Sequence, residues 1–149
     1  AGVPRVALPG KRPVSWLGDG DILFAARGTN NYALALRNTP ARVVCSPHFF
    51  VLKVSDKARI DPYFLAWQIN QKPAQDYFRQ SATGSHIPNI RRSVLEGLEV
   101  AVPSVSKQRM IADLWNAALE EKRQLNALLA NRQHQLNSVA ADLLTGRMR

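Results

Sequence analysis

The 149 residues suit one domain of ordinary size, and a hydrophobic fraction of 46% is sufficient for a packed core, which argues against an intrinsically disordered chain. The 20 Lys and Arg residues outnumber the 11 Asp and Glu residues, and the net charge of +9 favours a polyanionic partner such as nucleic acid. Cys45 is the single cysteine, so no disulfide can form within the chain, and the sequence contains neither a membrane-spanning apolar stretch nor a signal-peptide apolar region. We therefore expect a cytoplasmic protein with no membrane partner.

The first two thirds of the chain predict a small mixed α and β globe, and hence an α+β fold. Short runs rich in β-branched and aromatic residues, separated by turns that contain glycine or proline, are typical of antiparallel strands. Asp61 followed by Pro62 is a typical helix start, and Pro73 opens a second helical pattern. The expected strands are 15–17, 21–26, 32–36, 43–45, 49–54 and 99–102; the expected helices are 63–70 and 74–80, with a short turn or helix at 94–98.

The last third predicts one long helix from Ser106, as the cap, to Gly146, as a left-handed stop. About 38 helical residues would extend about 57 Å, which is longer than a small globe can cover. Alternating steps of four and three residues define a coiled-coil seam in which only Lys122 and Arg132 are not apolar. Its members are Ile111, Trp115, Ala118, Lys122, Leu125, Leu129, Arg132, Leu136, Val139 and Leu143, and its apolar positions form the expected dimer interface. A helix folded back on its own domain is the alternative.

Signatures of catalysis are weak throughout the sequence. Gly18-Asp19-Gly20 lacks the spacing of a glycine-rich cofactor loop, and no Walker-type phosphate loop is found. Cys45, His48, His86 and His134 do not have a standard metal-ligand spacing. We therefore expect a non-catalytic protein that needs no cofactor and no metal.

Two polar loops carry the residue types that read duplex DNA. Arginine pairs with guanine edges or phosphates, asparagine pairs with adenine edges, and hydroxyl groups bind phosphates. The expected contacts are Arg27, Thr29, Asn30, Asn31 and Tyr32 in the first loop, and Ser85, His86, Asn89, Arg91 and Arg92 in the second. An ordinary solvated surface is the competing interpretation.

The order of segments resembles a known family. Residues 20–25 (GDILFA) precede Arg27-Gly28-Thr29, an aromatic helix starts at Pro62, Gly84-Ser85 precedes IPNI at 87–90, and Pro103 is followed by Gln108 and Ile111. This ordered set resembles one target-recognition domain plus one helical spacer of a type I restriction-modification specificity subunit. The resemblance implies a recognition domain over 1–105 that reads half of a two-part DNA target, and a spacer and dimerisation helix over 106–149. It also implies two protein partners, the modification (methyltransferase) subunit and the restriction (translocase and nuclease) subunit.

The chain differs from the family pattern because the usual subunit has two recognition domains and two spacers. It is either a half-subunit that forms a homodimer or a fragment of a longer subunit. A two-fold symmetric pair predicts a bipartite palindromic target. The alternative function is a non-catalytic adaptor whose helix recruits a protein partner.

Overall fold

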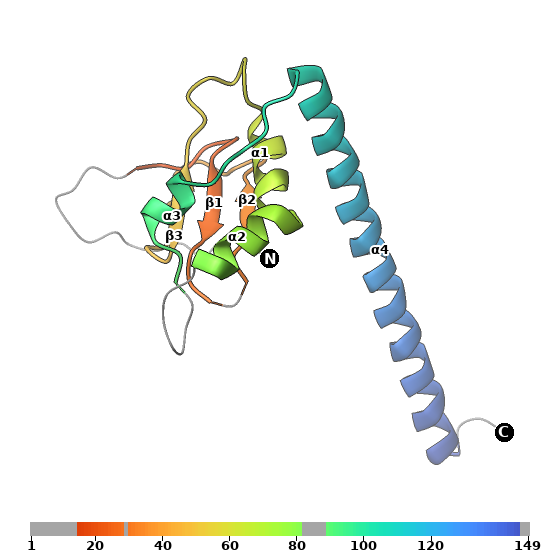
Figure 1. Cartoon of the computed structure of the whole chain (residues 1–149). Helices are drawn as coiled ribbons and strands as arrows, with labels where there is room; N and C mark the ends of the chain where they lie inside the picture. The colour runs from red at the N-terminus through yellow and green to blue at the C-terminus, as the bar shows by residue number, and fades with distance from the viewer. Residues whose placement is uncertain (1–14, 29, 82–88, 147–149) are drawn as a thin grey trace.

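A computed structural model describes residues 15–28, 30–81 and 89–146, and it shows an α+β globe from which one long helix projects (Figure 1). Within these ranges, strands β1 (Ile22–Ala25), β2 (Ala33–Ala35) and β3 (Phe49–Leu52) form an antiparallel sheet in the order β2-β1-β3. The helices in the same ranges are α1 (Pro62–Ile69), α2 (Lys72–Ser81), α3 (Arg92–Glu96) and α4 (Val105–Leu144). The predicted fold class is confirmed.

The core lies on one face of the sheet. Ile22 and Phe24 of the central strand β1 are fully buried, and the Phe24 ring packs against Phe78 of α2 with 5.1 Å between ring centroids. Ile69 of α1 and Ile90, just before α3, complete the centre of this cluster. Because side chains alternate along a strand, Leu23 points to the other face of the sheet. Residues of α1, of α2 and of the segment before α3 therefore meet over one side of β1.

The start of α1 agrees with its prediction. The Asp61 carboxylate oxygen Oδ1 accepts hydrogen bonds from the backbone N–H groups of Tyr63 (2.9 Å) and Phe64 (3.0 Å), and Pro62 occupies the first turn. These bonds satisfy two of the amides that have no partner within the helix itself. The other helices differ from prediction only at their ends, since α2 begins at Lys72 and α3 begins at Arg92.

Three strand predictions were wrong. The predicted strands 15–17 and 43–45 are reduced to one isolated bridge, in which the Leu17 amide donates to the Val43 carbonyl at 2.8 Å. Arg42 has a positive φ of 60°, and this turn prevents a longer ladder. Residues 99–102 form no strand, because the Gln68 side chain bonds both backbone groups of Ala101 (2.9 and 3.3 Å) and takes the place of a neighbouring strand.

The long helix is confirmed, but its predicted cap was wrong. Helix α4 begins at Val105 with Ser104 as the N-cap residue, so Ser106 lies inside the first turn. Gly146, at a φ of 68°, provides the left-handed conformation expected at the other end. Among the residues that the structure describes, no helix has the length and apolar character needed to cross a membrane.

Candidate nucleic-acid interface

The two polar loops of the sequence meet at the end of strand β1. Arg27 and Asn89 form an antiparallel bridge, and the Ile90 amide donates to the Ala26 carbonyl at 2.9 Å. Ile90 is fully buried, which anchors this segment in the core. Backbone hydrogen bonds therefore hold residues from both loops side by side, although 62 positions separate Arg27 from Asn89 in the sequence.

A depression lies beside this bridge. It has a volume of about 410 Å³ and is lined by Arg27, Gly28, His48 and Asn89. His48 is exposed in the turn before β3, and the pairing of Phe49 with Ala25 brings this turn next to the end of β1. His48 is not among the DNA contacts expected from the sequence. Its position beside the bridge follows from the strand register, which cannot be read from residue types alone.

Gly28 gives the first loop its direction. Its φ of 105° lies in the region that only glycine adopts readily, whereas no atom lies within 4 Å of the position where a Cβ would stand. A larger residue would therefore be strained by the backbone conformation and not by crowding.

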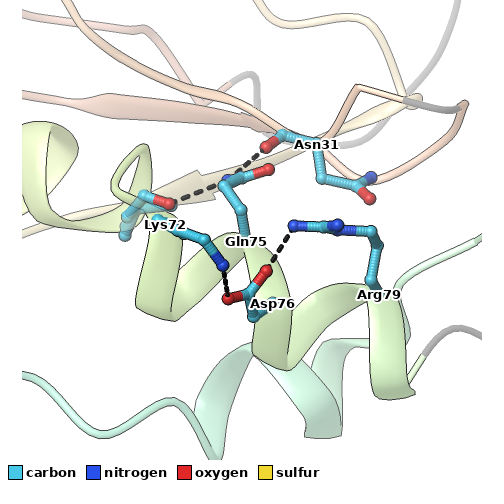
Figure 2. Close-up of polar contacts among 6 residues, drawn as sticks. Asn31, Lys72, Gln75, Asp76 and Arg79 are labelled. Atoms are coloured by element: carbon cyan, nitrogen blue, oxygen red, sulfur yellow. Dashed lines mark hydrogen bonds and ion pairs between the residues drawn. The ribbon is translucent and has the colours of Figure 1, made fainter.

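Asn31 has a different position from its exposed neighbours Asn30 and Tyr32. Its side chain is buried, with 8% of its surface exposed, and its amide Nδ2 donates to the Ala25 carbonyl at 2.9 Å. The Gln75 Nε2 group of α2 donates to the Asn31 carbonyl at 2.7 Å (Figure 2). It also donates to the Ile69 carbonyl at 2.8 Å. Asn31 and Gln75 therefore hold the first loop on the globe. This role of Gln75 was not predicted from the sequence.

The arginines near the depression differ in their partners. Arg27 and Arg91 are exposed, and no ion pair within the described ranges involves either residue. The Arg92 Nε group pairs with the Glu96 carboxylate at 2.7 Å, so part of its charge is balanced within α3. Arg27 lines the depression and Arg91 lies two residues after Asn89, so both exposed cations suit an anion at this surface.

Asp76 on α2 binds two further cations. Figure 2 shows Lys72 and Arg79 on either side of its carboxylate. The hydrogen bond from Lys72 is the main cause of the lowered pKa of Asp76. These three residues form an ion-paired group, with one positive charge in excess, on the helix that carries Gln75.

A model of one protein family, the type I restriction modification DNA specificity domain, matches residues 17–131. The chain belongs to this family. No curated protein matches the sequence. The match extends from the first bridge of the globe through much of α4, so it includes the sheet, the depression and the start of the long helix. The specificity domain is a DNA-recognition module of type I restriction-modification systems and not their catalytic part.

Not every expected contact of the specificity domain can be placed. Thr29, Ser85 and His86 lie outside the described residues. Arg27, Asn30, Tyr32, Asn89, Arg91 and Arg92 are exposed, whereas Asn31 is buried. Within the described part of the chain, no group of three or more His, Cys, Asp or Glu side chains could hold a metal ion.

The seam of the specificity domain is divided between two environments. Gln108 and Ala112 are the buried residues of α4, and the neighbouring seam residues Ile111 and Trp115 are half-buried where α4 passes α1. From Ala118 onward the seam is exposed, with Leu125 at 54%, Leu129 at 67%, Leu136 at 65%, Val139 at 44% and Leu143 at 62%. The helix therefore does not fold back on its domain, and Ile111 and Trp115 lie at the junction with the globe.

Proposed function

We propose that this specificity domain reads one half of a bipartite DNA target with the surface around the Arg27–Asn89 bridge. The observation that carries the proposal is the bridge itself. It joins two loops that each contain residue types suited to reading bases and binding phosphates. The proposed contacts are Arg27, Thr29, Asn30 and Tyr32 of the first loop, Ser85, His86, Asn89, Arg91 and Arg92 of the second loop, and His48 of the turn before β3.

The chemistry of these side chains supports two kinds of contact, one with base edges and one with phosphates. Arg27 and Asn89 stand next to each other, and their functional groups suit guanine and adenine edges respectively. Arg91 and Arg92 lie at the start of α3 and suit phosphate contacts, which position a protein on DNA and make its affinity depend on salt. Asn31 supports the loop without touching DNA in this proposal, because its amide is already bonded inside the globe.

We further propose that residues 106–149 hold two recognition domains, each formed by residues 1–105, at a fixed separation. The exposed seam from Ala118 to Leu143 is long enough to pair with the same seam of a second copy. Antiparallel pairing of two identical helices gives two-fold symmetry, and the target of such a homodimer is a bipartite palindrome. The modification (methyltransferase) and restriction (translocase and nuclease) subunits are the protein partners in this proposal, which rests on the family membership.

The test begins with selection of binding sites by the full chain from a pool of random duplexes, with and without the modification subunit. We expect enrichment of a bipartite site whose affinity falls steeply between about 50 and 200 mM salt. Arg27→Ala should weaken binding about 5-fold to 150-fold and relax the preference at one base pair, which corresponds to a lost bidentate base contact. Arg91→Ala should weaken binding to all sequences similarly.

Arg109→Ala is the matched control, because it removes an exposed arginine from α4 and leaves the depression intact. Its affinity should equal that of the wild type within about twofold, given the small effect of a distant surface charge. Failure of the wild type to bind any duplex, with or without the modification subunit, would refute the proposal. Equal effects of Arg27→Ala and Arg109→Ala would refute the assigned surface.

A further inference from the structure

Gln108 is the one fully buried polar side chain among the described residues, with 0% of its surface exposed. Its Oε1 atom accepts from the Asp61 amide at 2.9 Å. Its Nε2 group donates to the carbonyls of Arg59 (3.0 Å) and Pro103 (2.7 Å). Three hydrogen bonds from one side chain thus reach two segments of the globe that are far from each other in sequence.

These bonds join the starts of two helices. Asp61 caps α1 with its carboxylate, while its backbone amide binds Gln108. Pro103 lies directly before the N-cap residue of α4, and Gln108 itself lies in the first turns of α4. Figure 1 shows that α1 and the first turns of α4 lie side by side, and that the rest of α4 extends away from the globe. Gln108 therefore sits at the joint between the globe and the helix.

A small rotation at this joint has a large effect at the far end of the helix. The 32 residues from Asp113 to Leu144 follow the last buried position of α4 and extend about 48 Å at about 1.5 Å per residue. A tilt of about 4° moves the far end by about 3.4 Å, which equals the rise of one base pair. A spacer helix defines a separation to within one base pair only if the joint holds its angle within a few degrees.

We propose that Gln108 is a positioning residue that fixes the angle between the globe and α4 and thereby sets the spacing of the two half-sites that the protein accepts. The second part rests on the function proposed above, whereas the fixed angle does not. Gln108 itself touches no DNA in this proposal.

Glutamine is suited to this position for a physical reason. Apolar contacts are non-directional and tolerate small rotations of one helix over another, whereas hydrogen bonds weaken as their angles change. Methionine has a similar length but lacks the donors and the strong acceptor, and it would leave the Asp61 amide and two carbonyls without this partner. An apolar residue would fill the space but would not hold the angle.

The first test measures the joint without DNA. Spin labels are placed at the exposed positions Ser55→Cys in the globe and Asn131→Cys in α4, in a Cys45→Ser background. Labelled chains are diluted with unlabelled chains so that only distances within one chain contribute. Pulsed electron–electron double resonance should give a narrow distance distribution for the otherwise unchanged protein. The distribution for Gln108→Met should be at least about twofold broader, since a joint without these hydrogen bonds samples more tilt angles.

Gln75→Met is the matched control for this measurement. It also removes two Nε2 hydrogen bonds from a partly buried glutamine, but these bonds tie α2 to the first loop, away from the joint. Its distance distribution should keep the wild-type width. An unchanged width for Gln108→Met, or equal broadening in both variants, would overturn the proposal.

The second test measures spacing with the selected bipartite duplex and with versions whose spacer is one or two base pairs longer or shorter. We expect Gln108→Met to lower the preference for the best spacing about fivefold or more, while its affinity for a single half-site stays within about twofold of the wild type. An equal loss at every spacing would indicate a merely structural role and would overturn the proposal. If the wild type binds no duplex, the proposed function fails, and the distance distribution still decides whether Gln108 fixes the angle.

A third measurement needs no variant and applies even if Gln108→Met does not fold. The Asp61 amide of the wild type should exchange its hydrogen at least about 100-fold more slowly than an unstructured amide, because Gln108 holds it in a partly buried hydrogen bond. Exchange at the unstructured rate would show that the joint opens freely, and it would overturn the proposal.

Discussion

Leu129→Asp combined with Leu136→Asp should abolish pairing of the long helices. The two leucines are 67% and 65% exposed in the single chain, so pairing is what would bury them. Full burial of a leucine stabilises by about 1.5 to 3 kcal/mol, and burial of these exposed fractions in both copies contributes about 4 to 8 kcal/mol per dimer. Loss of the lower value alone weakens the dimer by about three orders of magnitude, before the cost of burying carboxylates is added.

The assay is sedimentation or light scattering over a range of protein concentrations. Ala127→Asp with His134→Asp is the matched control, because it places two carboxylates at the same seven-residue separation on the opposite face of α4. The control should dimerise like the wild type, and the seam variant should be a monomer with an intact globe. A dimeric seam variant would show that the helix pairs through another face, and a monomeric wild type would refute the homodimer.

Two further predictions concern charge and loop support. The Arg123 side chain, followed by Gln124, hydrogen-bonds Glu120 and lowers the pKa of this carboxyl from 4.5 to about 2, so its stabilisation of α4 is present above about pH 4.5 and is lost as the pH falls towards 2. Arg123→Ala should raise the Glu120 midpoint in an NMR titration towards 4.5, although the Gln124 hydrogen bond remains, and a wild-type midpoint already near 4.5 would contradict this. Asn31→Ala removes a buried bond to the Ala25 carbonyl and should lower the free energy of unfolding by about 1 to 3 kcal/mol, measured in urea. Asn30→Ala at the exposed neighbouring position should change it by less than about 0.5 kcal/mol, and equal effects of both substitutions would disprove the supporting role of Asn31.

Features determined by neighbouring residues were predicted best. The cap formed by Asp61, the helix-opening position of Pro62 and the left-handed Gly146 all depend on residues within one turn, and the structure confirms them. The three strands of the sheet were also predicted, with ends that differ by at most two residues. The prediction of a strand at 99–102 was wrong because this segment bonds to a side chain of α1 and not to another strand. No pattern within the segment indicates such a distant partner.

The candidate site was predicted in its residue types but not in its geometry. Both loops were identified from their composition, yet their meeting at Arg27 and Asn89 depends on pairing across 62 positions. Asn31 looked like its exposed neighbours in the sequence, and its burial follows from contacts with β1 and α2. Gln108 entered the sequence analysis only as part of a family pattern. Its structural role was not predicted, because its partners Asp61 and Arg59 lie 47 and 49 residues earlier in the chain and Pro103 lies just before α4.

The exposed part of α4 links folding of the chain to its assembly. Beyond Ala112 no residue of α4 is buried, so this segment receives little stabilisation from its own globe. Isolated helices are only marginally stable in water, and most helical stability in proteins comes from packing of an apolar face. We therefore expect the last turns of α4, beyond Asn131, to fray in a lone chain and to become stably helical only when a partner covers them. Chains made in excess of their partners would then be the ones that proteases cut first, which would keep the amount of protein matched to the number of complete complexes.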